Sequence, residues 1–190
     1  RILENQSDCD EKEILKALGE SIKLFESLND YASTELCLRR YIPLRHKMPS
    51  SDSNYVKDLL RLGKTCEKSG NEDLARKCFE EVIDRCGKDD SKDPGIAADA
   101  HMALGKRFKK IDKHSDARDA FQQAYGLYRR RDGETSVEFA TAAYHLGCAI
   151  IACGEDLVGH GYLSHALRVF EESGETNNPI ATDIRKRLGV

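Results

Sequence analysis

The chain has 190 residues, of which 39% are hydrophobic and 33% are charged, and its formal net charge is −3. This length allows one domain with a substantial core, and a composition without Trp and with four Pro favours helices with solvated outer faces. The nearly balanced charge excludes the strongly basic character that is typical of proteins that bind nucleic acid or an anionic membrane, so we expect neither partner.

The cysteines and the start of the chain indicate a reducing compartment. The seven Cys are odd in number and include no C-x-x-C pair, which is typical of reduced thiols that pack as small apolar residues. The chain opens on Arg1 without a signal-peptide pattern, and no run approaches the roughly 18 apolar residues of a membrane span. We therefore expect a cytoplasmic fragment of a longer protein.

A Leu-Gly pair recurs with a spacing of 42 residues, beginning at Leu62, Leu104, Leu146 and Leu188. A further pair, Leu18-Gly19, lies 44 residues before the first of these and indicates a two-residue insertion in an initial repeat. Self-similarity at such a period is the signature of a repeat protein. The sequence predicts a single domain, 1–190, with repeats at about 10–53, 54–95, 96–137 and 138–179 and a closing helix at 180–190.

A small residue follows each of these glycines after twelve positions, and a large residue follows four positions later. The small residues are Ala75, Ala117 and Gly159, and the large ones are Phe79, Phe121 and Leu163. Helices approach each other closely only where their side chains are small. We therefore expect each glycine to face the small residue of the second helix, with the large side chain beside the crossing.

Apolar periodicity predicts two helices in each repeat, separated by a polar turn. In chain order the predicted helices cover 11–27 and 30–47, 54–69 and 72–87, 96–111 and 114–131, 138–153 and 156–173, and 180–190. Polar loops with Pro94, Gly133 or Asn177 separate the repeats. The predicted fold class is therefore all-α, with four helical hairpins and a C-terminal helix.

The Leu-Gly pair of the first helix, followed by Ala and Phe in the second, resembles the tetratricopeptide repeat (TPR) over nearly the whole chain. The 42-residue period exceeds the 34 residues typical of that family and is similar to the variant in kinesin light chains and nephrocystin-like proteins. Leu59, His101 and Ala143 stand where the family often has an aromatic residue. The resemblance implies a right-handed superhelical stack of antiparallel helix pairs, a TPR-like α-solenoid.

In this family the first helices of successive repeats line a concave groove that binds a peptide or helix of another protein. Carried over by position, the implied groove residues are Lys57, Arg61, Lys64, Lys68, Met102, Lys106, Lys110, Tyr144 and Cys148. This surface is basic in two repeats and more apolar in the third, which predicts a partner with acidic residues followed by a bulky hydrophobic one. The alternative is that the cations only keep the surface soluble.

The resemblance implies a non-catalytic protein-interaction scaffold, with a cytoskeletal, ciliary or motor-cargo adaptor as the preferred class and an innate-immune sensor also compatible. A different function is self-association through the third repeat or the segment 180–190, which would make the domain a spacer in a larger complex. A clamp for chaperone tails is not expected, because Lys64 and Ala103 stand where Asn is needed.

No pattern indicates catalysis, a metal or a cofactor. The six His form no H-E-x-x-H motif and no cluster with metal-ligand spacing. Cys148 and His145 lie three residues apart, but nothing supplies the other parts of a nucleophilic site. The basic segment 128–131 is interpreted as a helix end in which cations suit the helix dipole, rather than as a nucleic-acid patch.

Overall fold

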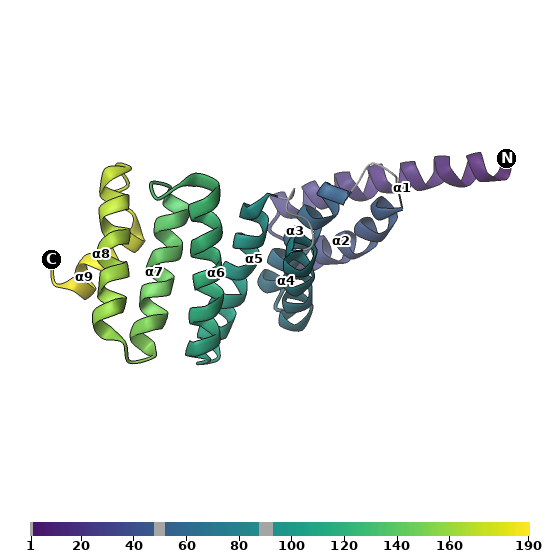
Figure 1. Ribbon diagram of the computed structural model, residues 1–190. Coiled ribbons are helices and arrows are strands. Elements are labelled where there is room, and N and C mark those ends of the chain that lie inside the picture. Colours follow the sequence, from purple (N-terminus) through teal and green to yellow (C-terminus); the bar gives the residue numbers. More distant parts are fainter. Residues whose placement is uncertain (1, 48–51, 88–92) are drawn as a thin grey trace. The chain divides into compact units, whose positions relative to one another are not determined.

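The computed structural model describes residues 2–47, 52–87 and 93–190, with side chains described from residue 11 and, in the second range, from residue 55. These residues form nine α-helices and no strand (Figure 1). The helices are α1 (Ile2–Ser27), α2 (Tyr31–His46), α3 (Asp52–Ser69), α4 (Glu72–Gly87), α5 (Pro94–Lys110), α6 (His114–Asp132), α7 (Val137–Ala152), α8 (Asp156–Glu172) and α9 (Pro179–Leu188).

Each predicted helix is present, and every end except the start of α1 lies within two residues of the prediction. Helix α1 begins at Ile2 instead of residue 11, because the preceding segment lacks apolar periodicity but also contains no Pro or Gly to end a helix. Side chains cap several starts: Asp93 accepts from the Gly95 amide, and Asn178 accepts from the Ile180 amide.

The helices form two compact bodies, here called the N-terminal body (residues 1–88, α1 to α4) and the C-terminal body (residues 89–190, α5 to α9). Within each body every helix packs on the next one in the chain, and α9 packs on both α8 and α7. The all-α class of stacked helical hairpins is therefore confirmed in each body. The single domain 1–190 and its superhelical course stay predictions.

A residue with left-handed backbone follows the first helix of every hairpin. These residues are Asn29 (φ 56°), Gly70 (φ 86°), Asp112 (φ 58°) and Gly154 (φ 90°). Gly, Asn and Asp adopt this conformation at the least cost, and each lies in the turn that sends the second helix back along the first. Successive members are 41, 42 and 42 residues apart, so the turn keeps the repeat period.

Gly63 of α3 and Gly105 of α5 touch an aromatic ring of the second helix in the same hairpin. A Cβ on Gly63 would lie 2.6 Å from Cε1 of Phe79, and a Cβ on Gly105 would lie 2.5 Å from Cε1 of Phe121. Both rings are fully buried and have no room to move aside. The predicted close approach is confirmed, but the large residue, rather than the small one, lies nearest to the glycine.

The last hairpin shows the predicted contact between two small residues. A Cβ on Gly147 of α7 would lie 2.9 Å from the carbonyl oxygen of Gly159 in α8 and 3.1 Å from Cδ2 of Leu163. Leu163 is smaller than the phenylalanines of the other hairpins, so the two backbones approach each other more closely here.

The Leu18-Gly19 pair is out of register with the other pairs, which corrects the predicted insertion. Each later glycine lies seven residues before the left-handed turn residue, whereas Gly19 lies ten residues before Asn29. Counted from the turns, the first hairpin has Ile22 in the glycine position and Leu38 in the phenylalanine position, both fully buried. The larger side chain on the first helix is therefore matched by a smaller one on the second.

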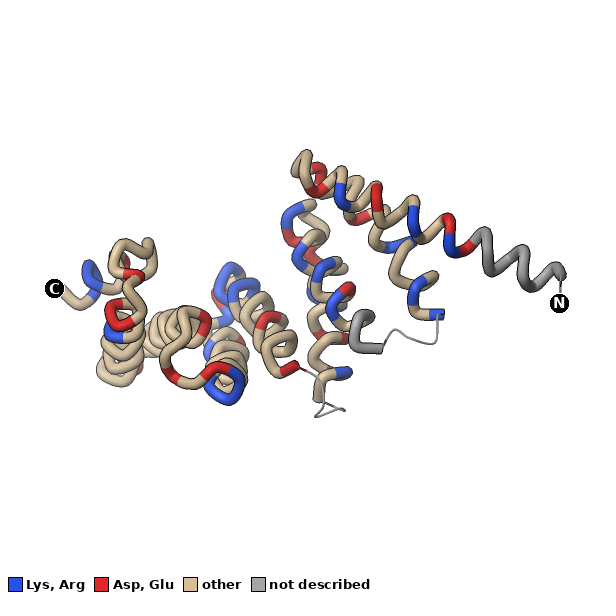
Figure 2. Tube along the Cα trace, turned by 90° about the horizontal axis from the view of Figure 1, so that it is seen from above, with Lys and Arg blue, Asp and Glu red and all other residues tan. Residues whose placement is uncertain are grey.

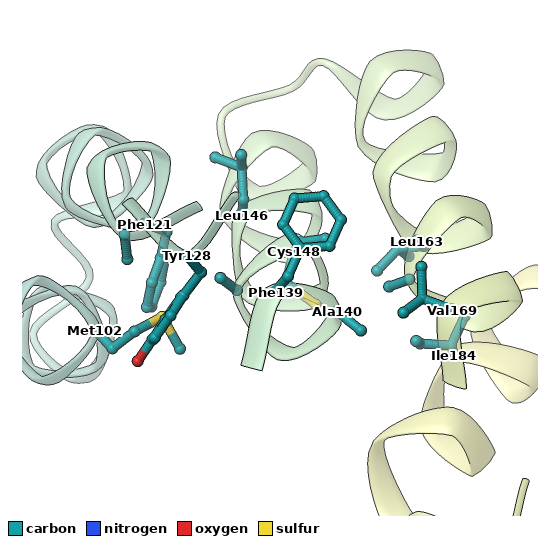
Figure 3. Close-up of a cluster of buried hydrophobic side chains, with 14 of the residues drawn as sticks. Met102, Phe121, Tyr128, Phe139, Ala140, Leu146, Cys148, Leu163, Val169 and Ile184 are labelled. Carbon is teal, nitrogen blue, oxygen red and sulfur yellow. The ribbon is translucent and has the colours of Figure 1, made fainter. Parts of the chain in front are cut away.

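The C-terminal body has a continuous core that runs from α5 to α9. Figure 3 shows Phe139 of α7 in the middle of this core, between Tyr128 of α6 and Leu163 of α8. The hydroxyl of Tyr128 donates a hydrogen bond to Oδ1 of Asp99, so its polar end is satisfied while its ring is buried. Ile184 of α9 is completely buried and closes the far end of the core.

We expect Gly105→Ala to lower the free energy of unfolding by about 2 kcal/mol, because its Cβ overlaps a buried ring that has no free space. The matched control is Gly126→Ala on α6, where a Cβ would meet no atom within 4 Å. That change should raise the free energy of unfolding by about 0.5 kcal/mol through helix propensity. Urea unfolding followed by circular dichroism measures both, and equal effects of the two variants would contradict the packing argument.

Candidate functional site

A pocket of about 370 Å³ lies in the N-terminal body, where the end of α1 and the start of α2 meet α3. Its lining residues are Glu26, Asn29, Tyr31, Lys57, Leu60, Arg61, Lys64, Thr65 and Lys68. Four of these are cations and one is an anion, so the lining is basic. The cations are the same four residues of α3 that the sequence predicts for the groove.

The amphipathic pattern of α3 places these cations on one face. Lys57, Arg61, Lys64 and Lys68 follow one another at intervals of four, three and four residues, which lie on the same side of a helix. The opposite side carries apolar residues such as Leu62, which is 5% exposed. Burial of the apolar face therefore turns the cations towards the pocket.

Arg61 and Glu26 form a two-pronged ion pair at the pocket. Nε of Arg61 donates to Oε1 at 2.7 Å, and Nη2 donates to Oε2 at 2.5 Å. The hydrogen bonds to Glu26 raise the pKa of Arg61. Both side chains stay more than a third exposed, so the pair contributes less than about 1 kcal/mol to stability. Its main effect is to join α1 to α3 and to neutralise one of the four cations.

The rest of the pocket adds aromatic and aliphatic surface. Nζ of Lys68 lies 4.8 Å from the ring centroid of Tyr31, within the range of cation–π attraction. Leu60 is 8% exposed and contributes an apolar wall. The hydroxyl of Thr65 donates to the carbonyl oxygen of Arg61 at 2.9 Å, so it is committed to its own helix.

Partly buried polar contacts join α3 to α2 near both ends of α3. Arg45 of α2 donates to Oδ2 of Asp58 at 2.9 Å, and burial raises the pKa of Asp58 against the opposing effect of this arginine. Near the other end, the carboxylate of Glu35 accepts from the hydroxyl of Ser69 at 2.5 Å and from the amide of Asn71 at 2.8 Å. These bonds hold the walls of the pocket in place.

The other predicted groove residues belong to the C-terminal body. Lys106 and Lys110 are exposed on α5. Tyr144 is half-buried on α7, and its hydroxyl donates to Oδ2 of Asp183 in α9 at 2.7 Å. Arg187 donates to the same oxygen at 2.6 Å, so α9 holds the polar end of Tyr144.

Met102 and Cys148, which the sequence also predicts for the groove, have buried side chains. They are 7% and 8% exposed and belong to the apolar core of the C-terminal body. Burial of an apolar side chain stabilises the fold, so residues at the edge of the groove face turn inwards when they are apolar. The segment 180–190, predicted as a site of self-association, likewise places Ala181 and Ile184 in the core.

The buried thiols of Cys66 and Cys78 are not activated. Burial raises the pKa of Cys66 to about 12 and that of Cys78 to about 11, so both are protonated at neutral pH, whereas a nucleophile requires the thiolate.

Within the described ranges, no group of three His, Cys, Asp or Glu is placed to hold a metal ion. Over the same residues, no helix combines the length and the apolar character needed to cross a bilayer. Figure 2 shows charges of both signs spread over the helices.

No protein-family model matches the chain, and no curated protein sequence does. Solved structures match its fold. BtubC (BKLC) from P. vanneervenii superposes with a TM-score of 0.65 at 16% identity, over 100% of this chain and 86% of that chain. The kinesin light chain TPR-like repeats of Podosopora anserina give 0.69 at 12% identity, over 90% and 82% of the two chains. Aspartyl phosphate phosphatase F from Bacillus subtilis gives 0.72 at 13% identity, over 100% and 51%.

The chain has a TPR-like fold. Folds of this class generally serve as scaffolds for protein interaction. Since these identities lie far below the level at which function is shared, the TPR-like neighbours establish the architecture, and the function must be argued from the site.

The sequence analysis missed the lining residues that lie outside α3, namely Glu26, Asn29 and Tyr31. They come from the end of α1 and the start of α2, whereas the groove was predicted only from α3, α5 and α7. The sequence analysis aligned Leu18-Gly19 with the later Leu-Gly pairs and so compared the first hairpin with the others out of register. In that alignment the lining residues of α1 and α2 could not be recognised. Counting back three residues from the turn residues makes Glu26 of α1 the equivalent of Glu67 of α3, the neighbour of Lys68.

His145 is the most strongly perturbed titratable group near the predicted groove of the C-terminal body. Its ring stacks on Phe121 with centroids 5.1 Å apart, and its buried Nδ1 has no hydrogen-bond partner among the described residues. Burial, reinforced by Lys106 and Lys109, lowers the pKa of His145 to about 3.

We expect this histidine to make the fold less stable in mild acid. Below a pH of about 6.5 the unfolded chain binds a proton at this site and the folded chain does not, so the free energy of unfolding decreases as the pH falls, by about 2 kcal/mol at pH ~5. His145→Phe keeps a ring against Phe121 and removes the titration. Urea unfolding near pH 7.5 and pH 5 should show a smaller loss for this variant. An equal loss in both proteins would show that His145 is protonated in the fold.

Proposed function

We propose that the chain is a non-catalytic scaffold and that its N-terminal body binds an acidic segment of a partner protein. The observation that carries this proposal is the pocket of about 370 Å³ beside α3, lined by Lys57, Arg61, Lys64 and Lys68. Fixed cations around a concave surface are suited to carboxylates, because charge-assisted hydrogen bonds are stronger than neutral ones. Solubility alone would not require these cations to line one concavity together with Tyr31 and Leu60.

The distance between Lys64 and Lys68 along α3 determines the spacing of carboxylates that we expect in the partner. Lys64 and Lys68 are separated by one helical turn, or about 6 Å along the helix. Two residues of an extended chain span about 6.6 Å, so carboxylates at alternate positions of an extended segment match this pair.

In the C-terminal body, taken by itself, Lys106 and Lys110 are exposed on α5 and remain proposed contacts for an acidic partner. Tyr144, held by α9, contributes a half-buried ring. The apolar half of the predicted partner sequence is not carried forward, because Met102 and Cys148 are buried.

At the level of the cell, we propose a cytoplasmic adaptor in the cytoskeletal, ciliary or motor-cargo class. Two of the similar structures are BtubC (BKLC) and a kinesin light chain repeat protein, which supports this class by analogy of fold. A biotin-ligase fusion that labels neighbouring proteins in cells tests it. Cytoskeletal or ciliary proteins should be enriched, and enrichment of nucleic-acid-binding proteins in their place would contradict the class.

The pocket itself is tested with a fluorescein-labelled peptide that carries Glu at alternate positions. Fluorescence anisotropy should show binding to the wild-type chain and none when every Glu of the peptide is replaced by Gln. The triple variant Lys57→Glu, Lys64→Glu, Lys68→Glu should bind at least about tenfold more weakly, because three attractive contacts become repulsive.

The matched control reverses Lys77, Lys113 and Lys186, which are exposed outside the pocket lining and give the same change in net charge. This control should keep most of the affinity, and circular dichroism should show unchanged helicity in both triple variants. Equal losses in the two variants would mean that net charge, rather than the pocket, attracts the peptide. No binding to the wild-type chain would overturn the proposal.

A further inference from the structure

The basic pocket beside α3 already contains one carboxylate, which belongs to the chain itself. Glu26 and Arg61 both line this pocket, and Arg61 donates to Glu26 from Nε at 2.7 Å and from Nη2 at 2.5 Å. The edge of a guanidinium that is formed by these two nitrogens holds one carboxylate at a time. The pocket therefore includes a carboxylate subsite, and its occupant in the structure is Glu26.

The position of Glu26 is explained by Arg61 and not by the helix to which it belongs. Glu26 is the last residue but one of α1. The C-terminal end of a helix carries partial negative charge, so an acidic residue in the last turn is slightly unfavourable for the helix. Glu26 therefore contributes a contact across the pocket, and we expect that its replacement by Gln does not weaken α1.

The ion pair between Arg61 and Glu26 is open enough to be exchanged. The two side chains are 40% and 37% exposed. An ion pair with this exposure is weak, because water competes for both charges. Exposed side chains change rotamer within nanoseconds, so Glu26 can turn out of the pocket without the movement of a helix.

We propose that Arg61 is an exchangeable carboxylate subsite, in which an acidic residue of the partner displaces Glu26. This inference rests on the proposed function, since it concerns the same pocket and the same acidic segment, and it adds Arg61 to the contacts of that segment. Asp58, one helical turn from Arg61, does not take the place of Glu26, because it accepts a hydrogen bond from Arg45 at 2.9 Å.

The cations on both sides of Arg61 favour the exchange. Lys57 and Lys64 lie one helical turn before and one turn after Arg61, on the same face of α3. A segment with several carboxylates contacts these lysines together with Arg61, whereas Glu26 supplies a single carboxylate. The segment therefore gains contacts that its competitor lacks.

The competition makes the pocket selective for segments with several acidic residues. A single carboxylate would only replace one ion pair at Arg61 by another of the same kind. A group that is tethered nearby acts at an effective concentration in the millimolar range, so Glu26 excludes isolated acids below about this concentration. Several carboxylates on one segment overcome this barrier, because their contacts add up.

Glu26→Gln tests the competition in the anisotropy assay with the fluorescein-labelled peptide that carries Glu at alternate positions. The Kd should fall about fivefold, because the peptide no longer has to break a weak ion pair. The matched control is Glu20→Gln, which lies exposed on α1 outside the pocket lining and gives the same change in net charge. The control should change the Kd less than about twofold, since salt screens distant exposed charges. Equal effects, or no effect of Glu26→Gln, would overturn the exchange.

Arg61→Lys tests whether the partner uses the two-pronged edge, because lysine keeps the charge and removes the fork. In the Glu26→Gln background this change should raise the Kd at least about threefold, since the peptide loses a two-pronged contact. In the wild-type background the rise should be smaller, because the same change also loosens the hold on Glu26. Equal rises in the two backgrounds, or no rise in either, would contradict the proposal.

Failure of the exchange and failure of the proposed function give different results. If the wild-type chain does not bind the peptide, the proposed function is wrong and the exchange with it. If the triple lysine variant loses the peptide while the Glu26 and Arg61 variants bind it like the wild type, only the exchange is wrong. Circular dichroism and urea unfolding check that every variant keeps its fold.

Discussion

The contact between a glycine of the first helix and an aromatic ring of the second sets the geometry of the α3–α4 and α5–α6 hairpins. In α3 and α5 the aromatic ring occupies the space that a Cβ would need, so the two helices cannot slide or rotate without a clash. This fixes which side of α3 is buried. Once Leu62 points inwards, Lys57, Arg61, Lys64 and Lys68 must point to the pocket. The position of the proposed binding surface is therefore a consequence of how the hairpin closes.

Part of the positive charge of the pocket lining is neutralised by an acidic residue of the same lining. Glu26 occupies the planar fork of Arg61 and leaves the three lysines as the other cations of the lining. Lysine is a flexible point charge, whereas arginine in a two-pronged pair is fixed in direction. In the proposed function, such a surface suits extended acidic segments of variable sequence better than one ligand of defined shape. This agrees with the general use of repeat folds as interaction surfaces.

Most of the fold could be predicted from the sequence because period, turn residues and apolar spacing agree with one another. The basic part of the site could also be predicted, since the four cations of α3 share one helix face. The burial of individual residues at the edge of the groove face could not be predicted from the sequence. Met102 and Cys148 are both buried in the core of the C-terminal body. Glu26 was missed because Leu18-Gly19 imitates the repeat signal one helical turn too early.

In these hairpins, a smaller residue on the first helix is paired with a larger one on the second, and the reverse. This pairing of side-chain sizes has an evolutionary consequence. The second hairpin combines Gly63 with Phe79, and the first combines Ile22 with Leu38, in both cases sixteen residues apart. Neither member can change size alone without a clash or a cavity. These positions should therefore covary among homologous sequences, and a repeat transplanted from one place in the chain to another should be tolerated only when both residues of its pair move together.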